Sequence, residues 1–204
     1  RDQPRSRGLG DVYKRQDFRT MKKLKIAGIV LILFVLYVII GMLVPFVHMK
    51  SVSKTNKSKI HTETFYSTSD KNGSDRAKIV SDNQEALDLR LDMIRKAKKE
   101  IIISTFDIRE GSSSDDIFSE LLKASRRGVK VKILVDGLYG TIHMSGKDIF
   151  AAVGSEPNVE IRFYNTPNFL KPWTINGCLH DKYIVADHKY LLMGGRNMFD
   201  YFLG

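Results

Sequence analysis

The most prominent hydrophobic pattern is a run of 22 uncharged, largely apolar residues at positions 26–47. About 20 apolar residues, at a rise of about 1.5 Å each, are enough to cross the hydrocarbon core of a bilayer. The run is longer than the apolar region of a signal peptide, and no small-residue cleavage site follows it. It also lacks the polar face of a core helix. The pattern therefore predicts an uncleaved transmembrane anchor.

The segments on either side of this run are polar. Residues 1–20 show neither helical nor strand periodicity, and we interpret them as cloning or assembly sequence, with a disordered leader as the alternative. Residues 48–81 are rich in Ser, Thr, Lys and Asn and are predicted to form a basic stalk. Lysines flank both ends of the run, but the tighter N-terminal cluster favours a cytoplasmic N-terminus, with the globular part outside. The opposite orientation is the alternative.

From residue 82 onward, helical and strand patterns alternate along the chain. Helical spacing predicts a first helix that begins at a Ser81–Gln84 capping box, and further helices over 115–127 and 147–153. Short apolar runs predict five strands, at 101–106, 129–136, 159–164, 182–186 and 190–193. Residues 137–140 are predicted to form a loop. A strand–helix–strand order implies parallel strands, so the predicted class is α/β, with a mixed sheet flanked by helices.

The net charge of +10 lies outside this predicted domain. Residues 1–20 carry +3 and residues 21–81 carry +7, whereas residues 82–204 sum to zero. A nucleic-acid-binding domain usually has a basic excess of its own, so the distribution points to a membrane surface rather than to nucleic acid. The single cysteine, Cys178, excludes an intramolecular disulfide framework and a multi-cysteine metal site.

One stretch near the C-terminus combines residue types that suit phosphate chemistry. His180 and Lys182 are two residues apart, so they share one face of a strand. Histidine can act as a nucleophile or a proton carrier near neutral pH, and lysine supplies a point charge for a phosphate. Gly194 and Gly195 would let the backbone approach a ligand, and Asn197 adds an amide donor. From these residues alone, a solvated surface turn stays the simpler interpretation.

The spacing of these residues resembles a known family signature. His180-x-Lys182-x₄-Asp187, followed by Gly-Gly-x-Asn at 194–197, resembles the motif of the phospholipase D superfamily. Two further stretches resemble its cardiolipin synthase-like members, 128–137 and 194–202. The resemblance covers residues 82–204 and implies one half of a two-motif fold.

The resemblance also implies a mechanism that uses no metal or organic cofactor. One motif histidine attacks phosphorus to form a phosphohistidine, and the histidine of a second motif protonates the leaving alcohol. The implied catalytic residues are His180, Lys182 and Asp187. The alternative for Asp187 is a role in supporting the structure rather than in the chemistry. The implied phosphate ligands are Lys182, Gly195 and Asn197, and Asp200 is the candidate for orienting a histidine.

The chain contains one such motif. We therefore expect an N-terminal fragment whose second motif lies in a missing C-terminal half, or a protein that forms its site as a homodimer. The expected function is a phosphatidyltransferase or hydrolase that acts on phospholipids and is anchored in a bacterial cell membrane. The alternatives are a single-motif dimeric nuclease of the same superfamily and a catalytically silent fragment. We expect Phe169 and Trp173, in the loop 165–178, to pack against the domain, with a lipid-facing rim as the alternative.

Overall fold

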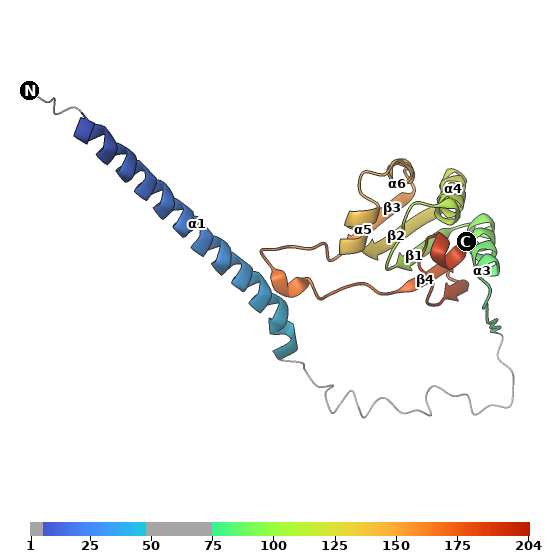
Figure 1. Ribbon diagram of the computed structural model, residues 1–204. Coiled ribbons are helices and arrows are strands. Elements are labelled where there is room, and N and C mark those ends of the chain that lie inside the picture. The colour runs from blue at the N-terminus through green and yellow to red at the C-terminus, as the bar shows by residue number, and fades with distance from the viewer. Residues whose placement is uncertain (1–5, 48–74) are drawn as a thin grey trace, which may run out of the picture. The chain divides into compact units, whose positions relative to one another are not determined.

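The computed structural model describes residues 6–47 and 75–204, which form two compact units (Figure 1). The first unit contains helix α1 (Ser6–Val47) together with Asn168–Trp173. Helix α1 begins well before the apolar run, so it includes most of the segment that showed no periodicity. Within the described residues, Thr20–Val47 is the one helical section long and apolar enough to cross a membrane. Most of the predicted stalk lies outside the described residues.

The second unit is built on a five-stranded sheet in the order β3-β2-β1-β4-β5. Its strands are β1 (Glu100–Thr105), β2 (Lys130–Asp136), β3 (Val159–Tyr164), β4 (Lys182–Ala186) and β5 (Tyr190–Met193). The first three strands run parallel, whereas β4 is antiparallel to both β1 and β5. The bounds agree with the five predicted strands to within one residue, and the α/β class with a mixed sheet is confirmed.

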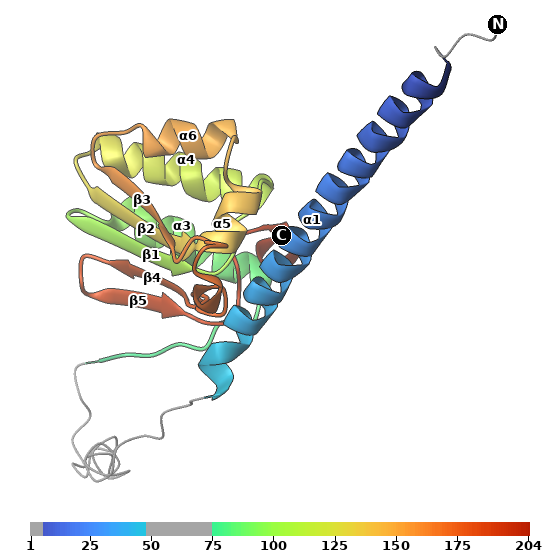
Figure 2. The same cartoon turned by 90° about the vertical axis from the view of Figure 1, so that its left-hand side faces the viewer.

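Helices cover one face of this sheet (Figure 2). They are α3 (Asn83–Lys96), α4 (Ser112–Arg126) and α6 (Asp148–Gly154), with the short α7 (Asp200–Leu203) against α3 and α4. Two short elements complete the unit's connections. Helix α5 (Gly137–His143) follows β2 directly, and the 3₁₀ turn η2 (Pro172–Thr174) lies in the loop between β3 and β4.

The core lies between the sheet and these helices. Ile133, Ile103 and Ile184 are aligned across β2, β1 and β4 and are buried. Phe118 and Leu121 of α4 are fully buried in the same apolar cluster. Side chains alternate along a strand, so the residues next to each of these isoleucines in its own strand lie on the opposite face of the sheet, which is more polar.

Two local predictions are wrong because a nearby aspartate supplies the cap. The N-cap of α3 is Asp82 rather than Ser81, and its side chain accepts a hydrogen bond from the Glu85 amide at 2.8 Å. The expected loop after β2 is helix α5, whose N-cap is Asp136. A carboxylate at this position satisfies amides at the start of a helix that have no partner within the helix.

Helix α4 begins three residues earlier than the sequence pattern predicts. The Asp200 carboxylate accepts hydrogen bonds from the amides of Ser112 and Ser113, at 3.1 and 2.8 Å, and from the Ser113 hydroxyl at 2.6 Å. These donors lower the pKa of the Asp200 carboxyl, with the Ser113 hydroxyl as the largest cause. The structure therefore shows that Asp200 binds the amides at the start of α4, and its role in orienting a histidine stays a prediction.

Asp187 holds together two turns at one end of the sheet. Asp187 and His188 are the central residues of the turn between β4 and β5, with positive φ angles of 54° and 55°, and the Lys189 amide donates to the Ala186 carbonyl oxygen across it at 3.0 Å. The Asp187 carboxylate accepts hydrogen bonds from the amides of Lys98, Lys99 and Glu100 at 2.9, 2.8 and 3.1 Å. These bonds, that of Lys98 first, lower the pKa of the Asp187 carboxyl.

We expect Asp187→Asn to lower the free energy of unfolding by about 1.5–3 kcal/mol, the range for hydrogen bonds to a charged group. Asparagine tolerates the positive φ, so the loss reports the hydrogen bonds and the charge rather than backbone strain. Thermal unfolding in detergent measures the effect. Asp116→Asn, an exposed carboxylate on α4, is the control, and equal melting temperatures for the two variants would contradict the role of Asp187.

The Asp200 cap predicts a loss of stability in acid. Its pKa in the folded protein lies below that in the unfolded chain, about 3.9, so its contribution is present above about pH 4 and is lost as the pH falls through the folded value. Denaturant titrations from neutral pH downward should show that Asp200→Asn is less stable than wild type at neutral pH. The two proteins should converge below pH 4. Asp115→Asn, in the first turn of the same helix, serves as the control; a constant gap at every pH would refute the prediction.

Candidate active site

The pairing of β1 with β4 brings the predicted motif to the end of β1. Lys182 lies opposite Thr105 in the sheet register, and Phe106 follows directly. The Phe106 ring centroid lies 4.8 Å from that of the His180 imidazole and 5.2 Å from Lys182 Nζ. Lys182 Nζ also donates a hydrogen bond to the His180 carbonyl oxygen at 3.1 Å. The structure therefore places His180 and Lys182 around one aromatic ring.

The ammonium group of Lys182 is partly desolvated. Burial lowers its pKa, and the nearby Asp181 carboxylate opposes this shift by raising it. An ammonium group has three N–H donors, and one of them is directed at the His180 carbonyl. The others can donate to an anionic ligand, which would also compensate the partly desolvated charge.

Asp136 holds the residues that precede His180. Its buried carboxylate accepts a hydrogen bond from the Leu179 amide at 2.9 Å. The same carboxylate caps α5 by accepting from the amides of Leu138 and Tyr139 at 3.0 and 3.2 Å. The sequence pattern did not lead us to predict that Asp136 holds this segment. The signal that could have shown it is an aspartate at the carboxyl end of a buried apolar strand.

The Gly-Gly-x-Asn segment runs beside the chain that follows β1. The Met198 amide donates to the Asp107 carbonyl at 3.1 Å, which fixes the neighbouring Asn197. Asn197 is buried, and its Oδ1 has no hydrogen-bond partner among the described residues. A Cβ atom at Gly195 would meet nothing within 4 Å, so this side of the loop is open. The unpaired Oδ1 is an acceptor, so it suits a water or a ligand group that donates a hydrogen bond, because leaving such an atom unpaired costs about 1–3 kcal/mol.

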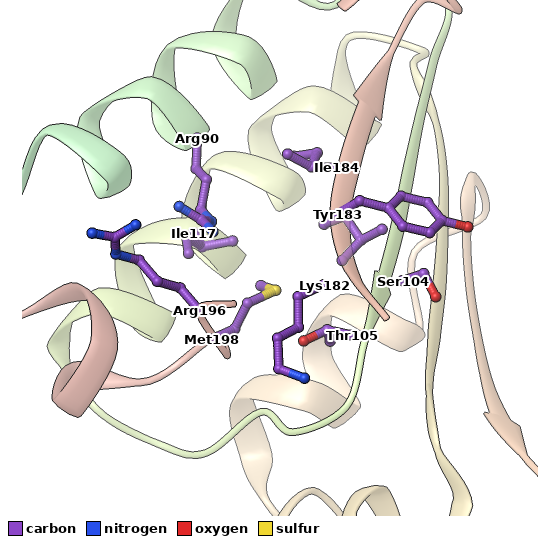
Figure 3. A pocket seen from close by; sticks show the side chains of 10 residues that line it. Arg90, Ser104, Thr105, Ile117, Lys182, Tyr183, Ile184, Arg196 and Met198 are labelled. Carbon is purple, nitrogen blue, oxygen red and sulfur yellow. The ribbon is translucent and has the colours of Figure 1, made fainter. Parts of the chain in front are cut away.

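Three cationic side chains line a narrow cavity beside the motif (Figure 3). They are Arg90 of α3, Lys182 and Arg196, and no carboxylate is among the lining residues. Burial, and then the charge of Arg196, lowers the pKa of Arg90 to about 10. The Thr105 hydroxyl in the same lining has no partner within the described residues. With a volume of about 10 Å³, the cavity is close to the size of one water molecule, so it supplies positive charge rather than room for a substrate.

A second histidine, His143, is linked to His180 through the rings of Tyr139 and Phe106. His143 Nδ1 is 2.7 Å from the buried Asp107 Oδ1, and Asp107 Oδ2 accepts from Arg109 Nε at 2.8 Å. The Tyr139 ring centroid lies 5.8 Å from that of His143 and 4.1 Å from that of Phe106, the ring that also contacts the motif histidine. Sequence reasoning missed this histidine–carboxylate pair, because the two residues lie far apart in the chain and match no motif.

Asp187 does not join these groups. It follows the last residue of β4, whereas Lys182 is the first, so the strand separates the two. Its geometry fits the supporting alternative for this motif position. In the part of the chain that the structure describes, no three His, Cys, Asp or Glu side chains are grouped to hold a metal ion.

Comparison with known sequences places these residues in a family. Residues 91–200, just over half of the chain, match the family described as "Cardiolipin synthase, PLD-like domain". Cardiolipin synthase B of Salmonella typhi is 35% identical over 106 residues, which cover 51% of this chain and 25% of that protein. Cardiolipin synthase of Clostridium perfringens is 32% identical over 116 residues, which cover 56% of this chain and 23% of that protein. The chain thus spans about a quarter of the length of these relatives.

Two solved structures give a more distant likeness. Nuc from Salmonella typhimurium, a phospholipase D family member, is 24% identical with a TM-score of 0.40, over 55% of this chain and 64% of that one. NucT from Helicobacter pylori is 17% identical with a TM-score of 0.45, over 59% and 72%. Since the family match extends over more than half of the sequence, the protein belongs to the phospholipase D superfamily, in its cardiolipin synthase-like branch.

Proposed function

We propose that this protein is a membrane-anchored phosphatidyltransferase or phosphodiesterase that acts on phospholipids through a phosphohistidine. The observation that carries the proposal is the placement of His180 and Lys182 around the Phe106 ring, beside a cavity lined by cations. This arrangement offers a nucleophile or proton carrier next to positive charge, which phosphoryl transfer requires. The cardiolipin synthases among its relatives support a phospholipid as the substrate.

In the proposed reaction, one motif imidazole attacks phosphorus and the bond from phosphorus to the leaving alcohol oxygen breaks. A second imidazole donates the proton that this oxygen needs. Water or an acceptor alcohol, deprotonated by that second imidazole, then attacks phosphorus and releases the first. His180 takes one of these two roles, while Lys182 and Asn197, with the open backbone at Gly195, bind the phosphoryl oxygens as charge develops.

The second motif histidine comes either from the remainder of the full-length protein or from a second copy of this chain. Both routes agree with one His-x-Lys-x₄-Asp motif in the sequence. Asp187 supports the motif by tying the β4–β5 turn to the start of β1. It makes no contact with the reacting atoms in this proposal.

The membrane is the proposed location of the substrate. The apolar section Thr20–Val47 has the length to span a bilayer, with the globular unit on the extracytoplasmic side. The zero net charge of residues 82–204 fits this location better than a nucleic-acid surface.

The test is turnover of phosphatidylglycerol by the full-length protein in vesicles. We expect His180→Ala to lower the rate at least about 100-fold, the scale for loss of a proton-transfer group, and Lys182→Met to lower it comparably. His188→Asn removes a histidine eight residues away at a turn and should keep wild-type turnover. An active His180→Ala variant would refute the assignment of His180.

The nuclease alternative predicts a different result for the same protein. We expect weak binding to single- and double-stranded DNA and no cleavage. If DNA binds tightly with a steep dependence on salt, and cleavage disappears in His180→Ala, the substrate assignment is wrong and the nuclease interpretation replaces it. Gel-shift and cleavage assays at several salt concentrations make the distinction.

A further inference from the structure

The segment between β3 and β4 exposes its apolar side chains. Phe169, Leu170 and Trp173 are 61%, 74% and 46% exposed, and all three lie in Asn168–Trp173, which we name the apolar loop. The expectation that Phe169 and Trp173 pack against the domain is therefore wrong. A cluster of exposed apolar side chains marks a surface that meets a membrane or another protein.

The apolar loop has a defined shape of its own. The Asn168 side chain accepts a hydrogen bond from the Leu170 amide at 2.9 Å, and its carbonyl oxygen accepts from the Lys171 amide at 2.9 Å. At its base, Asn165 Nδ2 donates to the Thr174 carbonyl oxygen, which ties the two flanking segments together. Because the loop is already ordered, it loses less conformational entropy when it docks.

The residue types in this region suit the interface of a lipid bilayer. The Trp ring is favoured there because it combines apolar area with an N–H donor, while Phe and Leu supply apolar side chains that are buried at the boundary between headgroups and acyl chains. Lys171 adds a positive charge that anionic headgroups attract. Residues 165–178 contain no Asp or Glu, so this segment carries no negative side-chain charge of its own.

The same compact unit also contains a segment that can enter a bilayer. Within the described residues, Thr20–Val47 is long and apolar enough to cross a membrane, and its side chains are largely exposed. The apolar loop belongs to this unit, so a bilayer is the apolar surface within its reach.

We propose that the apolar loop inserts into the membrane interface, with the side chains of Phe169, Leu170 and Trp173 in contact with lipid acyl chains. The partner is the bilayer that α1 enters. Trp173 lies seven residues before His180, so insertion keeps the motif close to the lipid headgroups. This proposal concerns the position of the loop, and it stands or fails independently of whether His180 catalyses phosphoryl transfer.

Trp173 reports on the loop directly, because it is the single tryptophan in the sequence. The 204-residue chain is reconstituted into nanodiscs that contain phosphatidylglycerol, with or without bromine on the acyl chains. We expect bromine to quench most of the Trp173 fluorescence and aqueous acrylamide to quench little of it. The double variant Phe169→Asp/Leu170→Asp should reverse both results, since buried carboxylates oppose insertion.

Leu191→Asp is the matched control, because Leu191 is a 60% exposed leucine on β5, away from the apolar loop. It should keep the wild-type quenching pattern. Three outcomes overturn the proposal: Trp173 quenched by acrylamide alone, which places it in water; Trp173 quenched by neither agent, which places it against protein; and unchanged bromine quenching in the double variant. Circular dichroism confirms that the variants keep their helix and strand content.

Discussion

The antiparallel pairing of β4 with β1 is the contact on which the site depends. It joins two segments that lie about 80 residues apart in the chain, and its register sets Lys182 opposite Thr105. Phe106 then comes into contact with both Lys182 and His180. A slip of one residue would turn Lys182 to the other face of the sheet, away from the cation-lined cavity, because side chains alternate along a strand. The geometry of the motif is therefore a consequence of strand register.

Three aspartates stabilise the loops around this pairing, and each does so by binding backbone amides. Asp136 holds the residue before His180, Asp187 ties the β4–β5 turn to β1, and Asp200 starts α4. A carboxylate suits this work because it accepts several hydrogen bonds at once, and amides at loop and helix ends lack partners. The spacing from Lys182 to Asp187 then has a simple physical meaning: it spans one five-residue strand, with the candidate site at one end and a turn at the other.

Features determined by short-range patterns were predicted well from the sequence, and features determined by distant partners were not. The five strands followed from apolar runs. His180 and Lys182 do lie around one ring, but His180 precedes β4, so they do not share the face of a strand as their spacing predicted. The start of α4 was not predicted, because its cap comes from Asp200, and the His143–Asp107 pair joins residues with no local pattern. The exposure of the apolar loop was also missed, since apolar residues are most often buried and a pattern does not show where a loop points.

The charge of the globular part shows why a sum over residues is a poor guide to a site. Residues 82–204 are neutral overall, yet Arg90, Lys182 and Arg196 line one small cavity without a carboxylate among its lining residues. The lowered pKa values of Arg90 and Lys182 show that burial disfavours their charged forms. An anionic group bound beside them would relieve this cost, whereas water can do so only in part. A domain with no net charge can thus still carry a local cluster of positive charge.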